Sequence, residues 1–122
     1  MRNVIALTLG SAFALSSVAH AGSVLVSPVM RAQSGAGGAL VCRILNVSSK
    51  PITVRIAIVR FDGAVSNSPS DVTVAPAQAI LDFVAGDFDG YCQFSGGFSK
   101  NDVRASAENF EGGRSIVVVP AN

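Results

Sequence analysis

The chain has 122 residues, of which 49% are hydrophobic, with nine Lys and Arg against eight Asp and Glu and a formal net charge of +1. This length suits one domain rather than two. A nearly neutral chain without a run of basic residues lacks the electrostatic footprint of a nucleic-acid-binding protein, so we expect no nucleic-acid partner.

Residues 1–21 show the three-part pattern of a secretory signal peptide. Arg2 supplies the positive charge, residues 4 to about 15 are apolar, and the small residues Ala19 and Ala21 precede Gly22. An apolar run of roughly a dozen residues is shorter than the 20 or so that a membrane helix needs. We therefore predict cleavage after residue 21, a periplasmic or secreted location and no membrane contact afterwards. A retained anchor is the alternative.

Cleavage changes the chemistry that the chain can perform. Arg2 and His20 leave with residues 1–21, so the remaining chain has eight basic residues, eight acidic residues and no histidine. Without imidazole, Ser–His and Cys–His catalysis and the usual copper sites have no ligand or base. Asp87 and Asp89 resemble the start of a calcium loop, but position twelve counted from Asp87 is Phe98, not an acidic residue. We expect a protein that is not an enzyme and has no cofactor or metal.

The mature chain reads as a series of short β-strands. Residues 23–26 form the first, and Pro28 marks it as an edge strand or a switch point because proline cannot donate to a ladder. Residues 40–47 alternate, with Leu40, Cys42 and Ile44 on one face. Residues 52–58 alternate most clearly, and their outward residues are predicted to be Thr53, Arg55 and Ala57.

The segment 76–86 is ambiguous. After an Asp-Gly turn at 62–63, a loop at 66–70 and a short strand at 72–74, several apolar residues fall at helical spacing between Pro76 and Gly86. The same segment also alternates as a strand, with Ala79, Leu81 and Phe83 facing inward. We favour the strand because nothing else in the chain is helical. A short helix is the alternative.

Three further runs complete the predicted sheets. Residues 91–95 carry Cys92 and Phe94 inward, residues 103–108 place Arg104, Ser106 and Glu108 outward, and residues 116–119 form the last strand before Pro120. Seven or eight short antiparallel strands with regular turns favour one all-β domain over residues 22–122. The expected architecture is a Greek-key, immunoglobulin-like β-sandwich.

Cys42 and Cys92 are the two cysteines, and both lie in alternating runs that we expect to face each other. Two cysteines in an exported chain are most simply one disulfide. Closing a loop of about fifty residues would stabilise the fold by about 4 kcal/mol in the chain-entropy model. Two buried free thiols are the alternative.

Two resemblances extend this interpretation. The cysteine spacing and the acidic turn before Tyr91-Cys92 resemble the central strands of an immunoglobulin-like domain, which implies architecture alone because the mature chain has no Trp. Residues 41–47, 50–54, 91–94 and 103–106 are similar to a group of small, uncharacterised exported bacterial proteins. That resemblance implies a bacterial periplasmic or secreted β-domain and brings no activity or functional residues.

A candidate binding patch follows from alternation. If the strands carrying Arg55, Tyr91 and Arg104 are neighbours in one sheet, as the immunoglobulin-like order would make them, their outward residues form one cluster. Its members are Thr53, Arg55, Tyr91, Gln93, Arg104 and Ser106. Arginine and tyrosine are favoured anchors at interfaces. We therefore predict that Arg55, Tyr91, Gln93 and Arg104 bind a protein or a carboxylate-bearing glycan, with an ordinary solvated face as the alternative.

The sequence thus favours a non-catalytic exported binding or structural module that is a monomer. One rival function is an assembly subunit that exchanges a strand with another copy. A second is a small inhibitor of an exported hydrolase, which would use the loop at residues 35–38 or the loop at residues 61–70.

Overall fold

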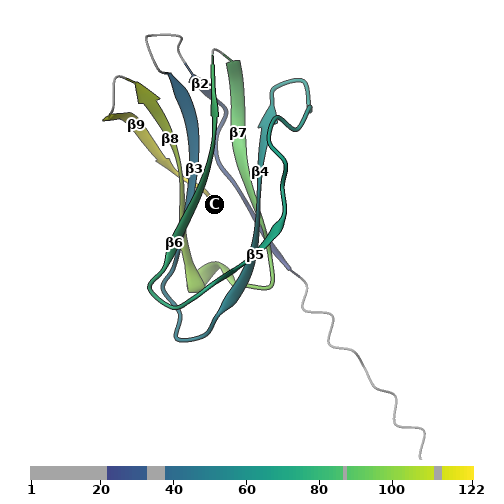
Figure 1. Ribbon diagram of the computed structural model, residues 1–122, viewed down its shortest axis with the longest axis vertical. Helices are drawn as coiled ribbons and strands as arrows, with labels where there is room; N and C mark the ends of the chain where they lie inside the picture. The colour runs from purple at the N-terminus through teal and green to yellow at the C-terminus, as the bar shows by residue number, and fades with distance from the viewer. Residues whose placement is uncertain (1–21, 33–37, 87, 112–113) are drawn as a thin grey trace, which may run out of the picture.

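The computed structural model describes residues 22–32, 38–86, 88–111 and 114–122. Two antiparallel sheets pack face to face in it, as Figure 1 shows. The predicted signal peptide, most of the loop at residues 35–38, Asp87 and the turn at 112–113 lie outside the described residues. Within those residues, no helix is both long and apolar enough to cross a membrane.

The first sheet, sheet A, is built around β7. Its strands in spatial order are β1 (Ser23–Val26), β7 (Phe88–Gly96), β4 (Ile52–Arg60) and β5 (Asp71–Val74), and β2 (Met30–Ala32) also pairs with β7. The ladder continues through the break between β1 and β2, because Ser27 N donates to Cys92 O at 2.9 Å and Cys92 N donates to Ser27 Oγ at 2.9 Å. Pro28 thus falls at an interruption, as the sequence predicts.

The second sheet, sheet B, is built around β3 and β8. Its spatial order is β6 (Ala79–Ala85), β3 (Ala39–Asn46), β8 (Val103–Glu111) and β9 (Arg114–Pro120). A single 3-10 turn, η1 (Lys100–Asp102), precedes β8. Within the segment 76–86, whose spacing also fits a helix, a turn at residues 76–77 precedes the strand β6, as favoured.

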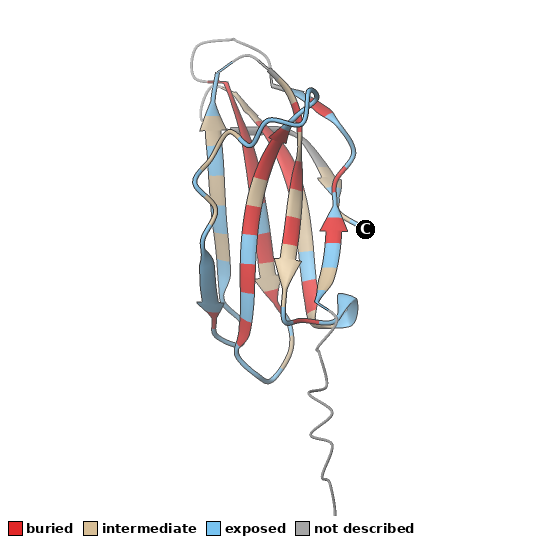
Figure 2. Ribbon diagram, turned by 90° about the vertical axis from the view of Figure 1, so that its right-hand side faces the viewer, coloured by how far each residue is buried: buried red, intermediate tan, exposed pale blue. Residues whose placement is uncertain are grey.

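The hydrophobic core lies between the sheets, where alternate residues of each strand meet. Figure 2 shows this as buried and exposed bands along single strands. The predicted inward faces of β3, β4 and β7 are confirmed, and fully buried core residues include Leu40, Ile44, Val54, Ile58 and Phe94. Burial of these side chains supplies most of the stabilising free energy of a domain of this size.

A disulfide between Cys42 and Cys92 joins the two sheets. Its S–S distance is 1.96 Å, its Cα–Cα distance is 5.6 Å, and both residues have zero exposure. The bond ties β3 of sheet B to β7 of sheet A at the centre of the core. The predicted disulfide and the predicted all-β sandwich are both confirmed.

The predicted facing of β6 is wrong. Register pairs Asp82 with the inward-facing Cys42, so Asp82 points toward the other sheet, while Leu81 and Phe83 face outward and are 51% and 55% exposed. Ile80 and Val84 pack against the core instead. The inward carboxylate is tolerated because it accepts hydrogen bonds, which the apolar pattern alone does not reveal.

Candidate binding surfaces

The structure divides the predicted binding patch into two groups. On β4 and β7, which are neighbours, Arg55 stands opposite Ser95, and Gln93 stands opposite Ala57. Thr53, Arg55, Tyr91 and Gln93 alternate with inward residues on these strands and therefore share the outer face of sheet A.

Arg104 and Ser106 lie on β8, in sheet B. The prediction that they join Arg55 and Tyr91 is therefore wrong. The reason is that β1, not β8, occupies the place beside β7.

We call the outer surface around these strands the sheet A face, defined by Val24, Val26, Arg55, Asp71, Tyr91 and Gln93. One row of partners crosses all four strands, because Ser95 pairs with both Val24 and Arg55, and Arg55 pairs with Asp71. In the next row, Gln93 pairs with Val26. The face is therefore apolar toward β1 and charged toward β5.

The charged side of this face is an exposed ion pair. Arg55 Nε lies 3.0 Å from Asp71 Oδ1, and the two side chains are 50% and 67% exposed. A pair this exposed stabilises a fold by less than about 1 kcal/mol. It does orient the guanidinium, whose remaining N–H groups can donate to a partner's acceptor.

The apolar side and the centre of the sheet A face supply contact area. Val24 is 47% exposed and Val26 is 40% exposed. Tyr91 and Gln93 lie on β7, the strand between β1 and β4, and are partly buried. Tyrosine and arginine with adjoining apolar surface are the composition that interfaces favour.

Arg104 lines a second feature, which we call the β1–β8 depression. This open hollow has a volume of about 560 Å³ and lies at the edge of the sandwich, where the lining residues are Leu25, Lys100, Val103, Arg104, Ala105, Ser106, Pro120, Ala121 and Asn122. It forms because β9 ends at Pro120 and the chain then crosses between the sheets. Ala121 N donates to Ala105 O, and Val26 N donates to Asn122 O, both at 3.0 Å.

The carboxylates that the sequence suggests as calcium ligands do not form a cluster among the described residues. Asp82 Oδ2 accepts a hydrogen bond from Asn67, and Asp89 Oδ1 lies 4.0 Å from Arg31 Nε. Asp87 lies outside the described residues. In the described part of the chain, no group of three or more His, Cys, Asp or Glu residues could hold a metal ion.

The two loops proposed for an inhibitor differ in how much can be described. The loop after β4 begins with a tight turn in which Arg60 N donates to Ala64 O at 2.8 Å, and Phe61 is 74% exposed in it. In the loop at residues 35–38, only Gly38 lies within the described residues. The structure therefore adds one exposed aromatic side chain to that hypothesis, and Ser68 and Ser70 at the end of the loop line an open hollow of about 260 Å³.

Four residues of these two surfaces were not predicted from the sequence. Asp71 was missed because its pairing with Arg55 depends on which strand lies beside β4. Val24 and Val26 could have been found, since they flank Leu25 in an alternating strand and must face away from it. Lys100 carries no local signal, because only the packing of η1 against β8 brings it to the depression.

Comparison with known proteins gives information about the fold only. The sequence matches no protein-family model and no curated protein. The crystal structure of Thermotoga maritima 1070 is similar, with a TM-score of 0.52 and 12% identity over 81% of this chain and 91% of that chain. At such low identity the likeness supports the sandwich architecture and says nothing about activity.

Proposed function

We propose that this protein is an exported, non-catalytic module that binds another protein through the sheet A face. The observation that carries the proposal is that β7, with Tyr91 and Gln93, lies between β1, with two exposed valines, and β4, with an oriented arginine, on one continuous surface. Such a surface offers both apolar area and directional donors. Area supplies affinity, and the donors on Arg55 supply orientation.

Export is supported by the pattern of residues 1–21 and by the disulfide, since disulfides persist in oxidising compartments. An immunoglobulin-like arrangement of the two cysteine strands, with β6 beside β3 and β4 beside β7, is part of the proposal too. Its support is that the disulfide joins strands from opposite sheets, and that each of these strands has neighbours on both sides. A module of this kind presents a rigid face because its central strands are covalently tied.

The absence of catalysis is proposed from composition. The mature chain has no histidine, and both of its cysteines form the disulfide. The usual general base and thiol nucleophile are therefore absent from residues 22–122.

The proposal is tested by comparing two double variants as bait in envelope extracts or culture medium of cells that produce the protein. The face variant is Arg55→Ala with Tyr91→Ala. The control is Lys50→Ala with Phe83→Ala, which also removes one cation and one aromatic ring, from a turn and from sheet B. We expect one protein to be retained by wild type and control and reduced at least about tenfold by the face variant. Equal retention by all three baits would contradict the proposal.

Strand exchange is a second candidate function, favoured by the position of β1 and β2. They form an edge of sheet A and insert Leu25 and Met30, which are 4% and 8% exposed, into the core. The same segment from another copy could occupy this place with the same contacts. Light scattering during size-exclusion chromatography distinguishes the two: a monomer at all concentrations contradicts exchange, and a ladder of multimers supports it.

A further inference from the structure

We propose that the β1–β8 depression binds a small amphipathic anion, with an apolar body and one carboxylate. This inference concerns a site separate from the sheet A face and does not depend on the proposed function. It rests on three properties of the depression, namely its apolar floor, its two cations and its size.

The floor of the depression is part of the hydrophobic core. Leu25 and Val103 line it, although they are only 4% and 2% exposed, and Ala105 and Ala121 also pack against the core. A ligand that covers them therefore extends the core outward. A volume of about 560 Å³ falls within the usual range for small-molecule sites.

Two cations stand at this apolar surface. The ion pairs among the described residues involve Arg31, Arg43 and Arg55, and none involves Lys100 or Arg104. Arg104 Nη1 donates to Val103 O at 2.8 Å, which leaves further N–H groups on its guanidinium. The nearby Asp102 is engaged elsewhere, because its Oδ2 accepts from Ser99 N at 3.2 Å.

The charge and the shape together define the ligand class. A carboxylate matches the fork of an arginine and gains a second contact from a lysine. An apolar chain or ring attached to it would lie on Leu25, Val103 and Ala121. A purely polar anion would leave the apolar floor exposed to water. A neutral apolar molecule would leave Lys100 and Arg104 without an anionic partner.

Isothermal titration with decanoate, kept below its micelle concentration, tests the proposal on the full mature chain. Any affinity tag belongs at the N-terminal end, since Asn122 lines the depression. We expect one decanoate per chain, bound at least about tenfold more tightly than decanol, because only decanoate carries a negative charge that can pair with the two cations. Equal binding of the alcohol, several ions per chain, or no binding of decanoate overturns the proposal.

Variants locate the site. Lys100→Gln with Arg104→Gln should weaken decanoate binding at least about tenfold and leave decanol binding unchanged. Arg31→Gln with Lys50→Gln removes the same charge from residues that do not line the depression, and should leave the binding of both ligands unchanged. Methyl resonances of Leu25 and Val103 should shift with decanoate in the wild type. An equal loss of decanoate affinity in both double variants, or methyl resonances that do not shift, would show that the ion binds elsewhere. Either result would contradict the assignment.

Discussion

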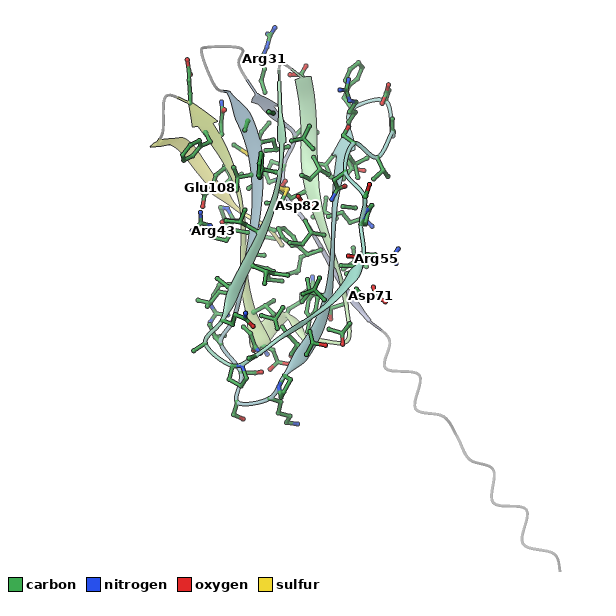
Figure 3. All side chains as sticks on the ribbon, viewed as in Figure 1. Arg31, Arg43, Arg55, Asp71, Asp82 and Glu108 are labelled. Carbon is green, nitrogen blue, oxygen red and sulfur yellow. A yellow bond between two sulfur atoms is a disulfide. The ribbon has the colours of Figure 1, made fainter. Side chains whose placement is uncertain are left out.

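Asn67 donates from its side-chain amide to Asp82 Oδ2 at 2.8 Å, and so links the loop after β4 to β6 of the opposite sheet. The same amide nitrogen donates to Ile56 O at 2.8 Å, and Asn67 Oδ1 accepts from Ile58 N at 2.9 Å. β5 pairs with β4 only over residues 52–55. One side chain therefore continues the ladder along β4 before β5 begins at Asp71, and satisfies an inward-facing carboxylate. In Figure 3, Asp82 lies on the core side of β6.

Replacement of Asn67 by alanine should destabilise the fold by about 2–4 kcal/mol, because it removes three hydrogen bonds, one of them to a charged group. Denaturant unfolding measures the change. Ser66→Ala is the matched control, since Ser66 Oγ makes only an exposed contact with Arg60 Nε, and it should change stability by less than about 0.5 kcal/mol. Similar losses in both variants would show that the amide does not link the sheets.

Removal of the disulfide should cost about 4 kcal/mol, since it closes a loop with a sequence separation of 50 residues in the unfolded chain. Cys42→Ala with Cys92→Ala, or reduction of the wild type, should lower the denaturant midpoint by corresponding amounts. The reduced protein should also gain the mass of two hydrogens. An unchanged midpoint under reducing conditions would mean that the bond contributes nothing to stability.

Gly96 should be harder to replace than Gly63, although both adopt positive φ. Its φ is +148°, and a Cβ built there would overlap Thr53 O, whereas Gly63 has a φ of +88° and open space around it. Gly63→Ala should cost about 1–3 kcal/mol from backbone strain alone. Gly96→Ala should cost more, because β4 and β7 must also separate there. Equal midpoints for the two variants would contradict this close approach.

Asn46, the last residue of β3, should contribute strongly to the stability of the fold. It is fully buried, its Nδ2 donates to Lys50 O and Val74 O at 2.8 and 3.0 Å, and its Oδ1 accepts from Ser48 N at 2.9 Å. Asn46→Ala leaves these groups unpaired and should cost about 3 kcal/mol or more. Asn101→Ala, at an exposed position of η1, should stay within about 0.5 kcal/mol. An unchanged melting temperature for Asn46→Ala in thermal unfolding would contradict this structural role.

Alternation was enough to predict the inward faces of β3, β4 and β7, because period-two patterns are local. The neighbours of each strand were not predictable in this way. In immunoglobulin domains the strand that follows the second cysteine strand lies beside it. Here β8 lies beside β3 and β1 lies beside β7, so Arg104 is separated from Arg55. Pairing between distant segments depends on the whole fold.

The facing of β6 failed for a different reason. Ala79, Leu81 and Phe83 look like an inward face until Asp82 is known to have Asn67 as a partner. Long-range hydrogen bonds of this kind leave no periodic signal. The grouping of Thr53, Arg55, Tyr91 and Gln93 did follow from the sequence, and the register of β4 with β7 supports it. Whether these residues bind a partner stays a prediction.

Site-specific photo-crosslinking tests the central claim most directly. A benzophenone amino acid placed at Gln93, on the sheet A face, is compared in producing cells with the same group at Leu81, which is 51% exposed on sheet B. We predict one crosslinked adduct of defined mass from position 93, absent from position 81 and lost when Arg55→Ala is added. No adduct from position 93, or the same adduct from both positions, would contradict a partner-binding sheet A face.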